Sequence, residues 1–372
     1  MAKTRLRCDA SLLRRRVLQL FALSLLGTIA VTNRFFLTQR RTVSQRKIIP
    51  IVKSPIIERN GRAFLEGSND TVPDLVPGMH RYSIVRFEKF FVPRWERITP
   101  LDFVFLPATR GQCESDQPFL IFLVLSMTRN WELRNAIRET WGSVNRTNTW
   151  GGKYLRKPVR VIFVLGLSGN DDSLLRESRM YGDIVHVSVK DNYYNLTYKV
   201  LMGIRWVYEF CRHVEFVAKV DEDTFPDVPV FLDILTSVNM TNTIMGPFFT
   251  FGKVHRQGKY TVSDALYPAP EFPPHCKGNF YLMPTYLAVR ILKTAQHLPY
   301  GNMEDAHLTG VVARAIGGIR YRGLTKKQYS THSPPGVCEY INGTKIVAQK
   351  VGPELAKEIW RRFNDDTLCS GS

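Results

Sequence analysis

Cysteine is scarce in this sequence of 372 residues: there are six, and no two of them stand in the CxxC spacing typical of a zinc site. No glycine-rich loop of the GxGxxG or Walker type follows a predicted strand, which excludes the usual sequence signs of dinucleotide or ATP binding. Acidic residues are also few, 33 against 51 Lys and Arg. Apolar residues nevertheless reach 44%, enough for a sizeable core, so disorder throughout the chain is excluded.

The basic excess is concentrated at the N-terminus. Residues 1–62 contain 14 Lys and Arg against 2 acids, and the rest of the chain has only a mild positive balance. A nucleic-acid-binding protein would have a basic face with stacking aromatic residues or a known binding motif, and the sequence contains neither. The sequence therefore predicts no nucleic-acid partner.

An uncharged apolar run at 17–32 follows three arginines at 14–16. At ~1.5 Å per residue the run covers roughly 24 Å, somewhat short of a ~30 Å hydrocarbon core, and snorkelling arginines can absorb the difference. The basic residues before it predict a cytosolic N-terminus and a lumenal remainder. We therefore expect an uncleaved transmembrane signal-anchor; a cleaved signal peptide, and hence a secreted protein, is the alternative.

Two features agree with a lumenal location. The chain has five Asn-x-Ser/Thr triplets that predict N-glycosylation, at Asn69, Asn145, Asn195, Asn239 and Asn342. If Cys8 lies in the cytosol, five cysteines remain in an oxidising compartment. At most two internal disulfides can then form, which leaves one thiol spare or paired with another chain.

Strand-like and helix-like segments alternate after residue 119. Strands are predicted at 119–127, 158–165, 183–189 and 214–220, with helices at 131–141, 171–181 and 196–210 between them. This alternation predicts an α/β domain with a mostly parallel central sheet. The aromatic segment 82–105 before it is too apolar for a free linker and is expected to pack on the domain.

Three consecutive acids, Asp221, Glu222 and Asp223, follow the strand predicted at 214–220, and Lys219 lies just inside it. Ligands bind at the carboxyl edge of an open α/β sheet, and a divalent cation would relieve the repulsion between such carboxylates. Mn²⁺ or Mg²⁺ prefers oxygen ligands and would leave coordination positions open for a diphosphate. The alternative is an acidic turn that caps the next helix.

Two further motifs carry charge. Glu304 and Asp305 precede an apolar helical stretch. One of these carboxylates can act as a general base; the alternative is that both are there because the helix dipole stabilises acids at a helix start. Arg134 and Arg138 are one helical turn apart and can approach a diphosphate or pair with acids.

Together these pieces resemble the β-1,3-glycosyltransferases of glycosyltransferase family 31. The matching stretches are FLVLSMTRNWELRNAIRETWG, VIFVLG, DNYYNLTYK, FVAKVDEDTF, YPAPEFPPHCKGNFYLMP and MEDAHLTG. They span about 113–323. The resemblance implies a GT-A-like fold, a UDP-sugar donor, Mn²⁺, a glycan acceptor, inversion to a β linkage, and a single-pass type II protein of the Golgi membrane.

The resemblance also assigns residues to roles. Asp221 and Asp223 fall at the metal and nucleotide motif, with Asp223 as the expected direct ligand, and Asp305 falls at the catalytic base. The donor and acceptor region would involve Arg134, Arg138, Lys219, Glu222, Tyr267, Gly278, Asn279, Phe280 and Glu304. The chain would divide into a cytosolic tail (1–16), a signal-anchor (17–33), a stem (34–112) and a lumenal catalytic domain (113–372).

Two departures from the family pattern stand out. Gln349 occupies the place where the family often has a histidine that can complete the metal shell, with His332 as a possible substitute. In addition, the spacing from Asp305 to Gly310 is one residue longer than usual.

We therefore expect an inverting UDP-hexose or UDP-N-acetylhexosamine β-1,3-transferase acting on a glycolipid or glycoprotein. The alternative is a catalytically inactive Golgi glycan-binding or chaperone-like protein on the same fold. The sequence leaves open which donor sugar and acceptor are used, which cysteines pair, and whether the chain forms a homodimer.

Overall fold

The computed structural model describes residues 89–106, 113, 117–169, 172–250, 252–330, 333–364 and 369. The expected tail, signal-anchor and most of the stem lie outside these residues, as do Asn69 and His332. Within the described ranges, no helix combines the length and the apolar character that a membrane span requires.

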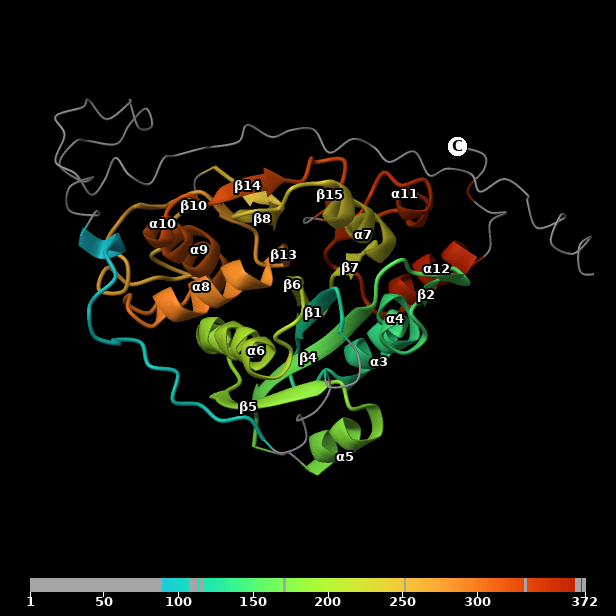
Figure 1. The fold of residues 1–372 in the computed structure, drawn as a ribbon, viewed down its shortest axis with the longest axis horizontal. Helices are drawn as coiled ribbons and strands as arrows, with labels where there is room; N and C mark the ends of the chain where they lie inside the picture. The colour runs from blue at the N-terminus through green and yellow to red at the C-terminus, as the bar shows by residue number, and fades with distance from the viewer. Residues whose placement is uncertain are drawn as a thin grey trace, which may run out of the picture. The chain divides into compact units, whose positions relative to one another are not determined.

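A seven-stranded sheet forms the centre of the described domain (Figure 1). In spatial order its strands are β14 (Arg320–Gly323), β8 (Thr243–Gly246), β13 (Phe280–Pro284), β6 (Phe216–Asp221), β1 (Leu120–Leu125), β4 (Val159–Leu167) and β5 (Ile184–Lys190). Neighbouring strands pair in parallel, except that β13 runs antiparallel to both β6 and β8. The predicted α/β domain with a mostly parallel sheet is confirmed.

Helices cover both faces of this sheet (Figure 1). One face packs against α6 (Leu196–Phe210), α8 (Thr285–Ala295) and the segment from η5 (His307–Val312) to α10 (Ala313–Ile316). The other face packs against α3 (Trp131–Glu139), α4 (Val144–Thr147), α7 (Val228–Ser237), α11 (Val337–Ile341) and α12 (Pro353–Asn364). Because both faces are covered, β1 is buried along its whole length, which explains its uninterrupted apolar run.

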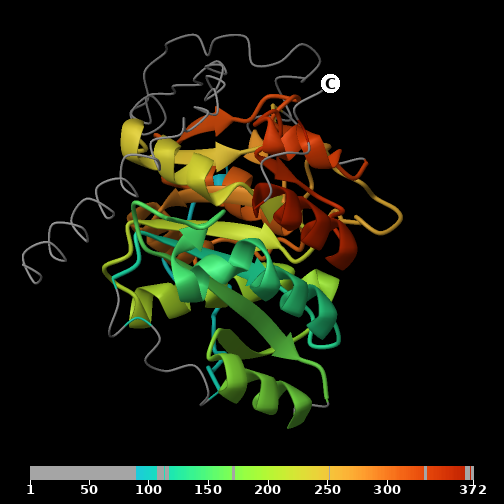
Figure 2. The same ribbon diagram turned by 90° about the vertical axis from the view of Figure 1, so that its right-hand side faces the viewer.

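The C-terminal helix α12 returns to the N-terminal half of the sheet. In Figure 2 the red C-terminal helices lie against the green segment that carries α3 and α4. Trp150 forms the contact, with ring centroids 4.8 Å from Trp360 and 5.1 Å from Phe363. The last helix is therefore part of the core and closes one side of the domain.

The remaining elements are short, apart from the ten-residue helix α5 (Asp172–Tyr181). The short ones are η1 (Lys89–Phe91), η3 (Trp141–Ser143), β2 (Thr149–Trp150), β3 (Lys153–Tyr154), η4 (Tyr193–Asn195), β7 (Phe225–Pro226), β9 (Phe248–Phe249), β10 (Gly252–Lys253), β11 (Glu271–Phe272), β12 (His275–Cys276), α9 (Glu304–Ala306), β15 (Tyr329–Ser330) and β16 (Val347–Ala348). The strands and helices predicted between residues 119 and 220 are all present, with ends that differ by a few residues at most.

Two disulfides close within the described residues, Cys113–Cys211 and Cys338–Cys369, and Cys276 is a buried free thiol. This pairing agrees with the prediction of at most two internal bridges and one spare thiol. The segment 89–106 packs on the domain, as predicted for the aromatic segment 82–105, of which 82–88 lie outside the described residues. Its Phe105 ring lies 5.8 Å from that of Phe210, and Leu101 is buried.

The segment from Asp305 to Gly310, for which the resemblance implied a longer spacing, coincides with a change of helix type. Residues His307–Val312 form η5, a π-helix, between the short α9 and α10. A π-turn closes its hydrogen bond over five residues instead of four, so it can accommodate one residue more without disturbing the flanking turns. The acidic pair therefore enters a continuous helical segment despite the longer spacing.

Candidate active site

The carboxyl end of β6 places the acidic triplet at the ligand-binding edge of the sheet. Asp221 is in register with Leu125, the last residue of β1, and its backbone N–H donates to the carbonyl of Asn279 at 3.0 Å. Because β13 is antiparallel to β6, the start of β13 arrives at the same edge. Loops that follow β1, β4, β5 and β6 therefore meet the segment before β13 at one place.

Lys219 is a buried cation at the centre of this edge. Its Nζ lies 2.5 Å from Oδ1 of Asp221 and 3.5 Å from Oε2 of Glu304, and it donates to the carbonyl of Gly278. Burial alone would lower the pKa of Lys219, but the two carboxylates outweigh it and the pKa lies above its ordinary value. Lys219 therefore stays charged and joins the acidic triplet to the second acidic motif.

Glu304 is the more deeply buried member of that second motif. Its Oε1 accepts a hydrogen bond from the hydroxyl of Tyr281. Tyr281 belongs to β13 and pairs in register with Lys219 of the neighbouring strand β6. Burial, with the nearby charges of Asp305 and Asp221, raises the pKa of Glu304 to about 7, although Lys219 and Tyr281 act in the opposite direction. At 3% exposure Glu304 cannot reach an acceptor directly.

Asp305 is only half-buried and lies against the backbone of Gly278. A Cβ on Gly278 would come within 3.1 Å of its Oδ2, so glycine permits this approach. Its Oδ1 accepts from the N–H of Ala306 at 2.8 Å, and its main-chain carbonyl accepts from the hydroxyl of Thr309 at 2.6 Å. Thr309 in turn accepts from the N–H of Cys276 at 2.9 Å, which ties η5 to β12.

Asp223 faces a different neighbour, the segment that contains Gln349. Its carboxylate accepts a hydrogen bond from the backbone N–H of Lys350, and its carbonyl accepts from the N–H of Val351 at 2.9 Å. Burial, together with the charge of Asp221, raises the pKa of Asp223 to about 6. The structure thus brings the segment of Gln349 beside the acidic triplet, as the sequence pattern suggested.

The donor set at this edge fits a divalent cation. Among the described residues no group of three or more His, Cys, Asp and Glu side chains has the geometry of a metal site. A cation that binds a diphosphate needs only one or two protein carboxylates, because the substrate supplies further oxygens. Asp223 meets that requirement, since burial and the charge of Asp221 disfavour its ionised form and a cation would neutralise that form. Asp221 is already paired with Lys219.

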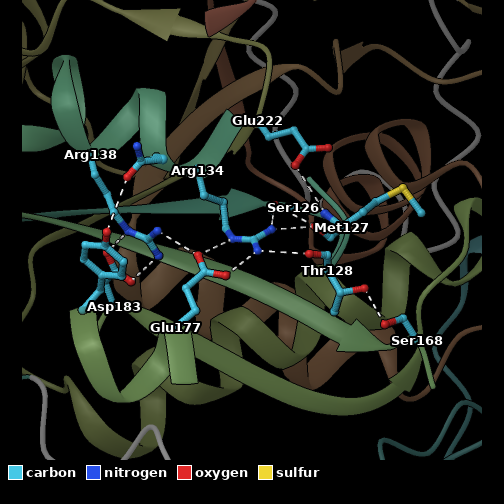
Figure 3. A network of polar contacts seen from close by, with 11 residues as sticks. Ser126, Met127, Thr128, Arg134, Arg138, Ser168, Glu177, Asp183 and Glu222 are labelled. Carbon is cyan, nitrogen blue, oxygen red and sulfur yellow. Dashed lines mark hydrogen bonds and ion pairs between the residues drawn. The ribbon is translucent and has the colours of Figure 1, made fainter. Parts of the chain in front are cut away.

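Glu222 holds the loop that follows β1 (Figure 3). Its carboxylate accepts from the backbone N–H of Met127 at 3.3 Å and from the side-chain amide of Asn130 at 2.5 Å. The hydroxyl of Thr128 also donates to Ser168 after β4 at 2.5 Å. Glu222 therefore shapes this edge of the sheet; a direct contact with a donor stays a prediction.

Arg134 and Arg138 form a buried network with acids (Figure 3). Arg134 pairs with Glu177 at 2.6 Å and donates to the carbonyls of Met127 and Thr128, at 2.6 and 3.1 Å. Arg138 pairs with Glu177 at 2.7 Å and, through two nitrogens, with Asp183 at 2.7 and 2.8 Å. Of the two roles expected for these arginines, the structure shows the pairing with acids. Arg134 reaches the site through the loop that it fixes, and donor binding by either arginine stays a prediction.

Three residues assigned to the sugar region take up core positions. Tyr267 is buried against Phe90, Phe91 and Phe272, in a cluster that also supports Ala306. Phe280 is fully buried and packs on Phe231. Asn279 accepts from the hydroxyl of Tyr329 at 2.8 Å, and its Nδ2 has no partner among the described residues. Of these three residues, only Asn279 has a buried polar atom, Nδ2, without a partner among the described residues at this edge of the sheet.

Sequence reasoning missed several residues at this edge. A buried ion pair joins Lys199 to Asp191 at 2.8 Å, and Lys199 also donates to the carbonyl of Ser126 at 2.6 Å. The hydroxyl of Tyr193 lies 4.0 Å from Sδ of Met303, two residues before Asp305. Asp191, Tyr193 and Lys199 all belong to the matching stretch DNYYNLTYK, which carried the resemblance without a role for each residue. Nothing in the sequence indicated a role for Thr309, apart from its position four residues after Asp305.

Comparison with known proteins finds one family by sequence. The family model described as galactosyltransferase matches residues 132–322. The chain is 34% identical over 258 residues to β-1,3-galactosyltransferase 5 of Mus musculus, covering 66% of this chain and 78% of the relative. It is 30% identical over 278 residues to β-1,3-galactosyltransferase 1 of the same organism, covering 72% and 80%.

Solved structures show a weaker likeness. The WbbM bifunctional glycosyltransferase aligns with a TM-score of 0.37 and 8% identity, covering 68% of this chain and 50% of that one. The mannosyltransferase PcManGT of Pyrobaculum calidifontis, solved with GDP-Man and Mn²⁺, aligns with a TM-score of 0.33 and 13% identity, covering 66% and 62%. TM-scores this low do not establish a shared fold.

Proposed function

Because this chain belongs to the galactosyltransferase family, we propose that it is an inverting enzyme that moves a hexose or N-acetylhexosamine from a UDP-sugar to a glycan hydroxyl in β-1,3 linkage. Glycosyl transfer itself follows from the family. The donor, the linkage and the acceptor, a glycolipid or glycoprotein, are the proposed part. The relatives named as β-1,3-galactosyltransferases support that part.

One observation carries the proposal: two acidic motifs 83 residues apart in sequence meet at the carboxyl edge of the sheet. Lys219 contacts Asp221 of one motif and Glu304 of the other, and Gly278 allows Asp305 to lie beside them. A structural acidic turn that capped α7 would not need this second motif. The mostly parallel sheet with its acidic edge also supports a GT-A-like fold.

Asp305 is proposed as the general base. The acceptor oxygen forms a bond to the anomeric carbon while the bond from that carbon to the diphosphate oxygen breaks. Asp305 takes the proton of the acceptor hydroxyl, and attack from the face opposite the leaving group inverts the configuration. Glu304, buried and bonded to Tyr281, would help to fix the position of its neighbour rather than touch the acceptor.

Asp223 is proposed to hold Mn²⁺ or Mg²⁺, with Asp221 kept in place by Lys219. A divalent cation, when bound, would neutralise charge on the diphosphate leaving group. The backbone N–H of Lys350 already donates to Asp223, so the segment of Gln349 is close enough to contribute an amide oxygen. His332 stays an untested candidate for the same role.

The proposed location is the Golgi membrane, with one N-terminal signal-anchor and a lumenal catalytic domain. The basic residues before the run at 17–32 support this orientation. The pairs Cys113–Cys211 and Cys338–Cys369 support an oxidising compartment. Carbonate extraction of membranes tests the anchor, since a cleaved and secreted protein would be released; light scattering of the lumenal part tests a homodimer.

UDP release tests the proposal directly. The purified lumenal protein is assayed with a panel of UDP-sugars and with β-galactoside and N-acetylhexosaminide acceptors, with Mn²⁺ and with excess chelator. We expect acceptor-dependent release from one or two donors that stops with chelator. No release from any combination would instead favour an inactive glycan-binding protein. The presence of Asp221, Asp223 and Asp305 argues against that alternative.

A further inference from the structure

Tyr193 lies beside the turn that carries Asp305, and a second tyrosine, Tyr260, packs against it. The hydroxyl of Tyr193 contacts Sδ of Met303 at 4.0 Å, two residues before the candidate base. The ring of Tyr193 meets that of Tyr260 edge-on, with centroids 6.1 Å apart. Burial, followed by the charge of Asp305, raises the pKa of Tyr193, which agrees with a position close to the carboxylates. We call Tyr193 and Tyr260 the tyrosine platform.

The platform is open to solvent on the side of Tyr260, which is 47% exposed. The exposed ring of Tyr260 thus extends the aromatic surface that begins at Tyr193 near the turn of Asp305. The apolar C–H face of a pyranose ring packs well on such a ring, while the sugar hydroxyls stay free to form hydrogen bonds.

A cation stands over the platform. Nζ of Lys259 lies 5.5 Å from the centroids of both tyrosine rings, within the range of a cation–π contact. Lys259 belongs to the segment 252–262, which has three Lys and Arg and no acid. Arg256 in this segment is engaged by the carbonyls of Val262, Tyr267 and Ala269, so it shapes the loop. Lys259 is exposed and presents its charge to solvent.

The loop that carries Lys259 and Tyr260 is fixed to the site. The side-chain amide of Asn302 donates to the carbonyl of Thr261 at 2.9 Å, which links the loop to the residues just before Asp305. Val262 packs in the same apolar cluster as Ala306. The platform is therefore held in place before a ligand binds, which lowers the entropic cost of binding.

We propose that the tyrosine platform is the acceptor subsite, and that Lys259 makes the enzyme prefer acceptor glycans with an acidic group. The inference rests on the proposed function. A hydroxyl that loses its proton to Asp305 must lie on the side of Asp305, where the platform is. The neighbours of Asp223, where the diphosphate would be held, are instead Lys350 and Val351. The acidic group is a uronate carboxylate or a sulfate on the sugar next to the reacting one.

Kinetics with matched acceptors test the subsite. Wild type, Tyr260→Ala and Lys259→Met are assayed with a neutral disaccharide acceptor, its glucuronate counterpart and its sulfated counterpart; Tyr154→Ala, at a tyrosine that is 83% exposed on β3, is the control. We expect Tyr260→Ala to raise the acceptor KM about tenfold for all three, without changing the donor KM. Lys259→Met should raise it about fivefold for the acidic acceptors alone.

An unchanged acceptor KM in Tyr260→Ala, or a raised donor KM, would overturn the subsite. An equal effect of Lys259→Met on neutral and acidic acceptors would overturn the charge preference, and the two acidic acceptors show which anion is preferred. Saturation-transfer NMR with the same acceptors reports binding without turnover. A wild-type protein that binds the acidic acceptor through Tyr260 but releases no UDP would reject the proposed function and keep the subsite.

Discussion

Nζ of Lys219 lies 2.5 Å from Oδ1 of Asp221, and the two side chains are only two residues apart at the end of β6. Residues at i and i+2 of a strand point to the same face, so strand geometry itself creates this pair. The same ammonium group lies 3.5 Å from Oε2 of Glu304, which comes from a distant part of the chain. One buried cation thus holds the two acidic motifs together.

Removal of that cation should destabilise the protein. Lys219→Met leaves two carboxylates without their buried partner, and breaking a buried pair in this way costs about 3–5 kcal/mol. We expect a matching loss in the free energy of urea unfolding, and part of it should return in the double variant Lys219→Met/Glu304→Gln. A single variant as stable as wild type would show that Lys219 does not join the motifs.

Thr309 should position Asp305. Thr309→Val removes the hydroxyl that donates to the carbonyl of Asp305 and leaves the buried N–H of Cys276 without its acceptor, at a cost of about 1–3 kcal/mol in stability. We expect kcat to fall about tenfold with little change in donor KM. Thr309→Ser keeps the hydroxyl and should restore kcat. Equal activity in the Val and Ser variants would remove this role.

Glu304 should make stability depend on pH. Its pKa is raised from 4.5 to about 7 in the folded protein, so the folded state binds the extra proton between these values. The stabilising contribution is complete below pH 4.5 and is lost as pH rises through 7, a loss of the order of 3 kcal/mol. Glu304→Gln cannot titrate. We therefore expect the unfolding free energy of chelator-treated wild type to fall more between pH 5 and 8 than that of Glu304→Gln; parallel profiles would contradict this assignment.

Asp223 should carry the affinity for the metal. We expect Asp223→Asn to weaken the binding of Mn²⁺ in the presence of UDP by about 100-fold, because it removes the charged oxygen ligand. The measurement is the rise in melting temperature with increasing Mn²⁺. Glu132→Gln, at an exposed carboxylate in the first turn of α3, is the control and should leave this rise unchanged. Equal effects of the two substitutions would mean that Asp223 is not a ligand.

Much of the fold was predictable because its pattern is local. The buried runs of β1 and β4 and the helix α6 are strong periodic signals in the sequence. The position of Asp221 at the ligand-binding edge followed from its place after a strand. The antiparallel direction of β13 was not predictable, because it depends on pairing with β6 and β8 from distant segments.

The parts of the site that the sequence did not predict are long-range contacts. Nothing local distinguishes Arg134, which pairs with Glu177 in a buried network, from an arginine that binds a phosphate. Tyr260 and Lys259 belong to a loop with no helical or strand period, and their place beside Tyr193 comes from tertiary packing alone. The π-helix η5 was not predicted either: the resemblance implied a longer spacing in this segment, but not the form of the helix.

The most direct test of the account is the formation of the β-1,3-linked product by wild type and by Asp305→Asn, measured with Mn²⁺, the preferred UDP-sugar and a saturating acceptor. We predict that Asp305→Asn binds Mn²⁺ and UDP as wild type does, while kcat falls by about 100- to 10,000-fold. A variant that forms product at a rate close to that of wild type would contradict the assignment of Asp305 as the base and, with it, the proposed mechanism.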